Sequence, residues 1–325
     1  MDERMNHNPD GIIGPVPGTS VPRFAGAATF VRLPAIDQVH RYDIAVLGAP
    51  FDNGTSFRPG ARFGPIAVRT ASRNLRPAYH PDLGIAPLER LQVVDAGDVP
   101  ANPFQLTVAI DQIRDHAREV LANRSRIVTI GGDHTVALPL LRAVNELHGP
   151  VALVHFDAHL DTWDTYFGSP LTHGTVFRRA FEEGLLIQDR SVHVGIRGPV
   201  YDELDLHDDA RFGFKIVRAG DIDRMGLEEV VATVRSRVGD APVYLSVDID
   251  VLDPAFAPGT GTPEMGGVTS RELLHLLRGL EGLAFVGGDV VEVAPAYDHA
   301  EVTALAAATV VYDIVTLMAK HPLAF

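Results

Sequence analysis

VALVHFDAHLD, residues 151–161, joins an apolar run to a cluster of acidic and imidazole side chains. Residues 151–156 are almost entirely apolar rather than alternating, which is typical of a strand covered by helices on both faces of a parallel sheet. A second run of this kind, VYLSV at 243–247, leads into DID. Both runs therefore predict buried parallel strands that end in acidic residues.

Strand-like and helix-like segments alternate outward from these two runs. Apolar spacing of three and four predicts a helix over 105–122, and Thr269 with Glu272 forms a capping box that opens another. A long apolar helix is expected from about 299 to 318. Further short β-branched runs, bounded by Gly, Pro or Asp, occur at 43–47, 126–130, 191–196 and 284–293. This alternation over nearly the whole chain predicts an α/β fold.

No internal repeat, low-complexity segment or linker divides the chain. Residues 1–40 are rich in Gly and Pro and show no clear period, so we expect an extended N-terminal arm there. Residues 41–325 are then expected to form a single domain.

Composition excludes several classes of partner and site. The 325 residues carry a formal net charge of −14, which argues against nucleic acid or an anionic membrane surface as the main partner. The chain contains no cysteine, so disulfides and thiolate metal sites are excluded, and a cytoplasmic location is expected. The first residues are polar and acidic, unlike a secretory signal, and Asp313 interrupts the most apolar stretch, 305–318. We therefore expect no membrane segment.

Acidic residues gather at the ends of the two buried strands. Asp157, His159 and Asp161 follow the first strand, and Asp248 and Asp250 follow the second. Residues two apart in an extended chain point to the same side, so each set can converge. Four carboxylates brought together would repel one another, and divalent cations relieve that repulsion. Four negative charges favour two cations over one.

Two more strand ends add a histidine and a glutamate. His134 lies in GGDH after the strand at 126–130, and Glu292 lies in DVVEVAP on the last strand. Imidazoles with several carboxylates and no thiolate form a ligand set for harder divalent metals, which favours Mn²⁺ over Zn²⁺. Single residues of these types have simpler roles, so we interpret Asp133 and Asp253 as turn or cap residues. His148 and His155 are interpreted as structural histidines.

These motifs together resemble the ureohydrolase family, which includes arginase, agmatinase and guanidinobutyrase. The resemblance covers residue 41 to the C-terminus. It rests on GAPFDNGTSFRPGARFGP at 48–65, GGDHT at 131–135, FDAHLD at 156–161, HGT at 173–175, SVDIDVLDPAFAPGTGTP at 246–263 and EVAPAYD at 292–298. It implies a three-layer α/β/α domain with a mainly parallel central sheet, and hydrolysis of a linear guanidino compound to urea and a primary amine. It also implies a homo-oligomer, either a trimer or a hexamer.

The resemblance also implies a role for each candidate site residue. His173 would be the proton shuttle, Glu292 would orient the guanidinium, and Thr262 would lie near its leaving groups. Two Mn²⁺ ions per subunit would share Asp157 and Asp248. One ion would be held by His134, Asp157, Asp161 and Asp248, and the other by Asp157, His159, Asp248 and Asp250.

The loop DTWDTYFGSPLTHGT, residues 161–175, is expected to select the substrate. It lacks the arginase-type pattern for an amino acid head group, which disfavours free arginine. Trp163, Tyr166 and Phe167 with the negative charge of Asp164 would suit the ammonium of agmatine. We expect Trp163 and Asp164 to bind substrate, although Trp163 serves equally well as a packing residue.

Several alternatives remain open at this point. A guanidinobutyrase is the second candidate function, followed by hydrolases of 3-guanidinopropionate, guanidine itself or proclavaminate-type compounds. Other classes are a binuclear phosphoesterase, which would need basic donors that the motifs lack, and a deacetylase, which needs only one metal. A non-catalytic family member would have no need of the full set of candidate residues.

Overall fold

The computed structural model describes residues 11–122 and 124–321. Eight parallel strands form one sheet in the order β2-β1-β3-β8-β7-β4-β5-β6. The strands are β1 Ile44–Ala49, β2 Val93–Asp98, β3 Arg126–Gly131, β4 Ala152–Phe156, β5 Ser191–Ile196, β6 Phe214–Arg218, β7 Pro242–Asp248 and β8 Ala284–Val291. The α/β prediction with a parallel sheet is confirmed.

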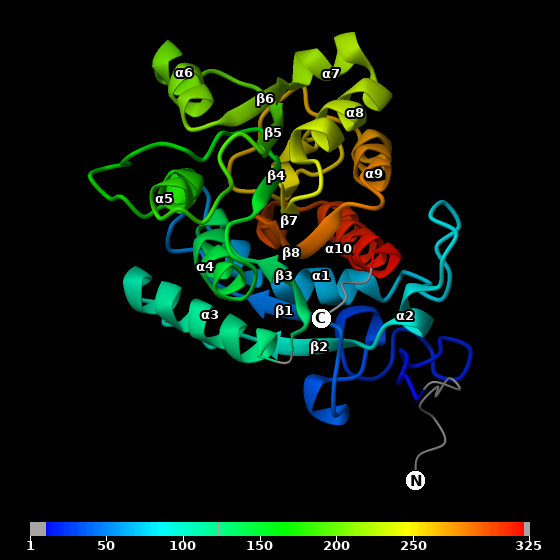
Figure 1. Ribbon diagram of the computed structural model, residues 1–325. Helices are drawn as coiled ribbons and strands as arrows, with labels where there is room; N and C mark the ends of the chain where they lie inside the picture. The colour runs from blue at the N-terminus through cyan, green and yellow to red at the C-terminus, as the bar shows by residue number, and fades with distance from the viewer. Residues whose placement is uncertain (1–10, 123, 322–325) are drawn as a thin grey trace.

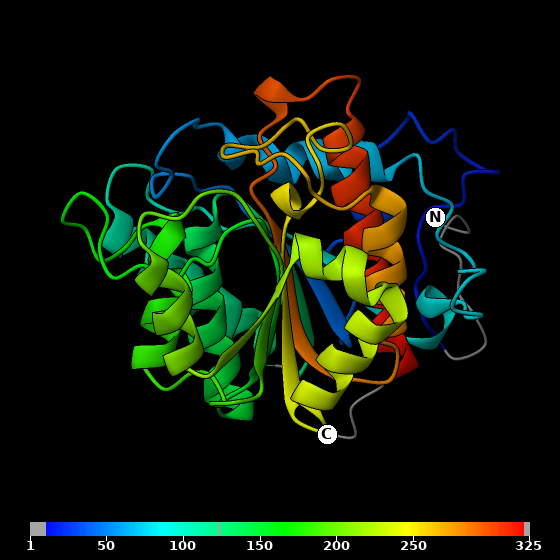
Figure 2. The same cartoon turned by 90° about the horizontal axis from the view of Figure 1, so that it is seen from above.

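Helices cover both faces of the sheet and make the three layers seen in Figures 1 and 2. The helices α3, α4 and α5 pack together on one face, and α1, α8, α9 and α10 pack on the other. Their bounds are α1 Gly64–Ser72, α2 Pro87–Arg90, α3 Leu106–Leu121, α4 Ala137–His148, α5 Val176–Glu182, α6 Glu203–Arg211, α7 Ala219–Met225, α8 Leu227–Val238, α9 Ser270–Gly279 and α10 Val302–Lys320. One apolar core lies on each side of the sheet.

Two strands were not predicted from the sequence, and both lie at the edges of the sheet. β2 reads VVDAGD and β6 reads FKIVR, and each has exposed positions along its length. An edge strand is half solvated, so it lacks the continuous apolar run that marks a central strand. The central strands β4 and β7 are buried almost throughout, as their composition predicts.

The helix α10 is long and apolar enough to cross a membrane by length and composition alone, with a mean hydropathy of 1.8. In the fold, 78% of the apolar stretch of α10 is buried, and the helix packs against α1 and β8. Asp313 in its middle contacts His80 and Arg278. These contacts agree with the prediction of a buried helix.

The described part of the N-terminal arm, residues 11–40, lies over the body of the domain. Phe30, Val31 and Leu33 are buried, and the Phe30 N–H donates to Asp95 on the edge strand β2. Residues 1–10 of the predicted arm lie outside the described residues.

Candidate metal centre and active site

The carboxyl ends of four adjacent strands, β3, β8, β7 and β4, bring the predicted ligands together. Parallel strands end at one edge of the sheet, which is where ligands bind in open α/β folds. The six side chains are His134 after β3, Asp157, His159 and Asp161 after β4, and Asp248 and Asp250 at the end of β7 and just beyond it. All are buried except His159, which is partly exposed.

The six side chains form two groups that share Asp157. In the first, His134 Nδ1 lies 3.2 Å from Asp157 Oδ2, 2.9 Å from Asp161 Oδ2 and 3.3 Å from Asp248 Oδ2. In the second, His159 Nδ1 lies 3.3 Å from Asp157 Oδ1 and 3.1 Å from Asp250 Oδ2. Each oxygen of Asp157 therefore faces a different imidazole, as a bridging ligand of two metals requires.

A hydrogen-bond chain behind His134 tests whether this site fits a cation. Ser246 Oγ donates to Asp289 Oδ1 at 2.6 Å, and Tyr244 donates to the other oxygen of that buried carboxylate. Because the Ser246 proton is committed there, its oxygen accepts from His134 Nε2 at 2.8 Å. His134 Nδ1 is then directed at carboxylate oxygens, an arrangement that either a proton on Nδ1 or a bound metal cation stabilises. The residues fit a bound divalent metal.

The electrostatics of the site agree with this fit. Burial and the neighbouring Asp250 and Asp157 hold the pKa of Asp248 well above its usual range. Burial raises the pKa of Asp250 to about 6 against the opposing effect of His159. Burial lowers the pKa of His134, but its three carboxylate neighbours outweigh burial and hold that pKa well above the ordinary value. Protons thus compensate a concentration of buried negative charge that cations would otherwise neutralise.

Glu292 and His173 lie side by side next to the first group. His173 Nδ1 lies 2.8 Å from Glu292 Oε1, which also accepts the His134 backbone N–H. Glu292 Oε2 is buried and has no hydrogen-bond partner among the described residues. One carboxylate oxygen is thus occupied, and the other is an open acceptor.

The His173 ring is held in a position to carry a proton. Burial lowers its pKa, but the Glu292 carboxylate outweighs burial and raises the pKa to about 9. Its Nε2 lies 2.6 Å from the hydroxyl of Ser56, a residue that lines the cavity and that the sequence did not single out.

Two residues of the site have an unusual backbone conformation. Asp161 and Glu292 have φ of +56° and +64°, in the left-handed region that non-glycine residues rarely adopt. Such strain persists where the surrounding structure enforces it and is common at functional sites. Aspartate is among the non-glycine residues that adopt this conformation more often, whereas the glutamate at 292 carries no local signal for it.

A cavity of about 620 Å³ opens from these groups to the surface. Its wall includes His159, Asp161, His173, Asp248 and Thr262, together with Trp163, Tyr166, Tyr201, Glu264, Arg58 and Arg197. The Thr262 hydroxyl lies 3.5 Å from Asp250 Oδ2. The wall thus combines the candidate metal ligands with aromatic rings and a carboxylate, Glu264, which the sequence analysis did not identify.

The aromatic cluster predicted in the loop 161–175 forms, since Tyr166 contacts both Trp163 and Phe167, but only part of it lines the cavity. Trp163 stacks on Tyr166 at 6.0 Å between ring centroids and packs against Tyr201, a partner that came from outside the loop. Phe167 is 92% exposed and is not part of the cavity wall. Trp163 both packs and lines the cavity, so the two predicted roles are compatible.

Asp164 does not contribute to the cavity as expected. Its side chain is 63% exposed and forms an ion pair with Arg179 at 2.6 Å, and it is absent from the cavity wall. The arginine on α5 draws this carboxylate to the surface. The prediction that Asp164 adds negative charge at the mouth of the substrate cavity is therefore wrong.

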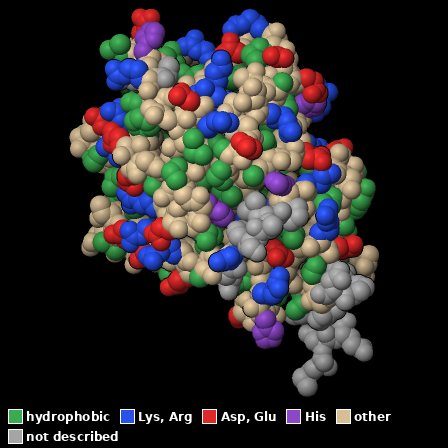
Figure 3. Space-filling view, viewed as in Figure 1, with side chains coloured by type: hydrophobic (Ala, Val, Ile, Leu, Met, Phe, Trp, Pro, Cys, Tyr) green, Lys and Arg blue, Asp and Glu red, His purple; other side chains and the backbone are tan. Residues whose placement is uncertain are grey.

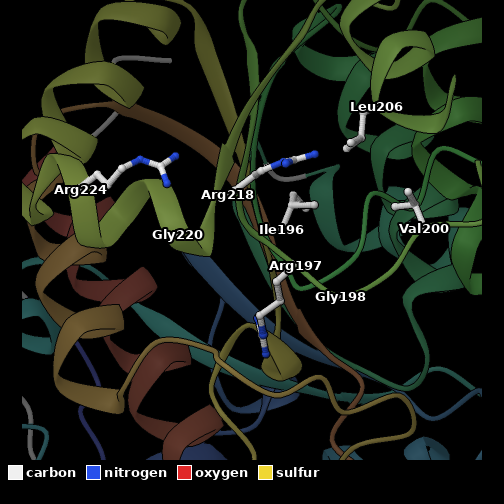
Figure 4. Close-up of a pocket in the computed structure, with 8 residues that line it drawn as sticks. All are labelled: Ile196, Arg197, Gly198, Val200, Leu206, Arg218, Gly220 and Arg224. Carbon is white, nitrogen blue, oxygen red and sulfur yellow. The ribbon is translucent and has the colours of Figure 1, made fainter. Parts of the chain in front are cut away.

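The two arginines of the cavity wall are committed to the protein backbone. Arg58 donates to the carbonyls of Thr260 and Gly261 and lies 4.5 Å from the ring centroid of Tyr297. Arg197 donates to five carbonyls, including those of residues 250, 252 and 264. Figure 4, a close-up of an adjoining cavity of about 350 Å³, shows Arg197 directed away from Arg218 and Arg224.

The simpler interpretations of Asp133, Asp253 and His155 agree with their contacts. Asp133 caps a short 3₁₀ turn by accepting the Thr135 N–H, and Asp253 accepts three backbone N–H groups in a turn. His148 ends α4. His155 is fully buried and uses both ring nitrogens in contacts with other side chains.

The surface supports no extended basic patch on the face that Figure 3 presents. Acidic and basic side chains are interspersed there.

Comparisons with known proteins identify the family. The model of the arginase family matches residues 42–316. Putative agmatinase 1 of Schizosaccharomyces pombe is 46% identical over 92% of this chain and 84% of its own length. Guanidinopropionase of Pseudomonas aeruginosa is 46% identical over 94% of this chain and 96% of its own. The crystal structure of proclavaminate amidino hydrolase from Streptomyces clavuligerus is 43% identical and gives a TM-score of 0.87, covering 92% of this chain and 99% of that one. The chain is therefore a member of the arginase family.

Proposed function

We propose that this chain is a binuclear manganese hydrolase that cleaves a linear guanidino compound to urea and a primary amine, with agmatine as its substrate. The observation that carries the proposal is the pair of imidazole–carboxylate groups sharing Asp157, with Glu292 and His173 beside them at the base of an open cavity. The relatives named above are hydrolases of guanidino or amidino compounds, which supports the reaction class.

The metals would be held by the six residues described above, with Asp157 and Asp248 shared. Oxygen and imidazole ligands without thiolate support Mn²⁺ as the metal. Two divalent cations at this site would supply Lewis acidity and activate water at neutral pH.

The other residues would bind the guanidinium and move a proton. Glu292 Oε2 is the open buried acceptor and would receive a guanidinium N–H, which positions the guanidinium carbon above the ligand groups. The amine must leave with a proton, and His173, whose pKa is raised to about 9, would donate it from its ring. Ser56 at Nε2 would return a proton from the cavity.

Agmatine is favoured by the charges of the cavity wall. Arg58 and Arg197 are occupied by backbone carbonyls, so neither guanidinium is offered to a substrate carboxylate. The Glu264 carboxylate lines the cavity and has no ion pair or hydrogen bond among the described residues. With the rings of Trp163 and Tyr201, it would attract the terminal ammonium of agmatine.

A guanidinoalkanoate hydrolase is the second candidate, including a guanidinobutyrase. The observation in its favour is the similarity to guanidinopropionase, which equals the similarity to the putative agmatinase. Identity alone therefore does not discriminate between a cationic and an anionic substrate tail.

Urea release from agmatine, 4-guanidinobutyrate, 3-guanidinopropionate and arginine, each measured as kcat/KM with Mn²⁺, tests the proposal. We expect agmatine to give the highest value. A higher value for either guanidinoalkanoate would establish the second candidate, and arginine as best substrate would contradict our interpretation of the loop and cavity. No urea from any of the four would refute the reaction class.

A further inference from the structure

A line of buried polar side chains runs away from the candidate metal centre behind Asp157. His155 Nε2 lies 2.8 Å from Asp157 Oδ2, His155 Nδ1 lies 2.6 Å from His193 Nδ1, and His193 Nε2 lies 3.3 Å from Asp209 Oδ2. His155, His193 and Asp209 are each fully buried. Three titratable groups with no access to water are costly, so their arrangement calls for an explanation.

Each oxygen of Asp157 is held by one donor. The backbone N–H of His159 donates to Oδ1 at 2.6 Å, and His155 Nε2 donates to Oδ2 at 2.8 Å. These are the same two oxygens that face different imidazoles, Oδ1 toward His159 and Oδ2 toward His134. The two donors thus fix the carboxylate in the orientation in which it spans both ligand groups.

His193 fixes which nitrogen of His155 carries the proton. Only one proton fits between the two Nδ1 atoms at 2.6 Å, and a neutral His155 that donates from Nε2 must accept at Nδ1. His193 is therefore the donor, and its Nε2 lies 3.3 Å from Asp209 Oδ2 on α6 without a hydrogen bond between them. The rings are held by packing, His155 at 4.5 Å from Phe177 and His193 at 4.4 Å from Phe214 between centroids.

We propose that His155 and His193 are positioning residues that hold Asp157 in its bridging orientation. The inference rests on the proposed binuclear centre. It predicts that both metals depend on an imidazole that contacts neither of them, because a loosened Asp157 would no longer span the pair. A packing role alone would tolerate any ring of similar size at position 155.

Mn²⁺ binding to the metal-free full-length protein tests this inference. The variants are His155→Phe, which keeps a ring but removes the donor, and His155→Gln, whose amide nitrogen replaces Nε2. His80→Phe is the matched control, because His80 is also buried and ion-paired, with Asp313, on a part of the fold remote from the ligands. Calorimetric titration gives the affinity for each equivalent, and electron paramagnetic resonance distinguishes a spin-coupled Mn²⁺ pair from isolated ions.

Wild type and His80→Phe are expected to bind two equivalents with a coupled spectrum. His155→Phe should bind Mn²⁺ about 10–100-fold more weakly and show the spectrum of isolated ions, and His155→Gln should restore most of both. Unchanged affinity and coupling in His155→Phe would overturn the inference, and so would equal loss in the Phe and Gln variants. A wild type without two Mn²⁺ sites would refute the proposed function instead.

His193 provides an independent second arm. His193→Phe should reproduce the loss, and His193→Asn, whose amide replaces the Nδ1 donor, should restore binding. If His155→Phe does not fold, this pair decides the question by the same two measurements. Wild-type coupling in a folded His193→Phe protein would overturn the role of His193.

Discussion

Replacing His173 by alanine is the sharpest test of how this site moves a proton. His173 contacts Glu292 and Ser56 and makes no hydrogen bond to any of the six candidate metal ligands. After the substitution, Glu292 Oε1 still accepts the His134 backbone N–H. The substitution should therefore impair proton delivery to the leaving amine, and the protein should still bind both metals.

The magnitude follows from the role of a general acid. Such a group contributes about 10²–10⁴-fold to rate, which corresponds to about 3–5 kcal/mol of barrier. We expect kcat of His173→Ala to fall by this factor, with two equivalents of Mn²⁺ still bound. The assay combines urea release at saturating agmatine with metal analysis of the same dialysed sample. His116→Ala, on the outer helix α3, is the control for loss of a histidine away from the site.

The pH dependence gives the same test a second readout. A raised pKa means that the His173 proton is present below the pKa and is lost as pH rises through it. Wild-type kcat should therefore decline on the alkaline side at or below about pH 9, since bound cations lower the value. That decline should be absent in His173→Ala. Turnover within threefold of wild type, or loss of both metals with the histidine, would refute the assigned role.

Three further outcomes follow from contacts around the site. Ser246→Ala removes the acceptor behind His134 and should weaken Mn²⁺ binding about 10–100-fold by calorimetry, whereas Ser125→Ala, another buried serine, should leave binding unchanged. Glu264→Gln should lower kcat/KM for agmatine about tenfold or more and spare 4-guanidinobutyrate, whereas Asp164→Asn should change neither beyond about twofold. Equal effects on both substrates would contradict the role of Glu264. Removing the metal with a chelator should abolish urea release and lower the melting temperature. Adding Mn²⁺ at about 100 times its Kd should restore about 2.7 kcal/mol to the free energy of unfolding. An unchanged melting temperature would contradict a metal held by buried carboxylates.

The central sheet and the ligand set could be predicted because their signals are local. A strand buried on both faces must be apolar along its whole length, as at 151–156 and 243–247, and residues placed directly after such strands share one edge. The motifs that follow these two strands contain five of the six candidate ligands, His134 follows the strand at 126–130, and the structure brings the six together. The edge strands β2 and β6 were not predicted, because half-exposed strands lack that pattern.

The wall of the substrate cavity could not be predicted in the same way. Asp164 follows Trp163 in sequence, but Arg179 on α5 draws its carboxylate to the surface. Glu264 and Tyr201 come from other segments and enter the wall only when the loops fold over the sheet edge. A loop residue has no periodic constraint, so which partner captures its side chain depends on long-range contacts.

The sequence by itself determined the α/β class, the parallel core and the identity of the candidate metal ligands. Strand burial and the position of a residue at a strand end depend on residues that are neighbours in the sequence. Only the tertiary structure decided which oxygen of Asp157 faces which imidazole and which buried groups stand behind the ligands. Ser246 with Asp289, and His155 with His193, meet across neighbouring strands of the sheet. Strand order brings those residues into contact, and strand order is set by packing over the whole domain rather than by any local pattern.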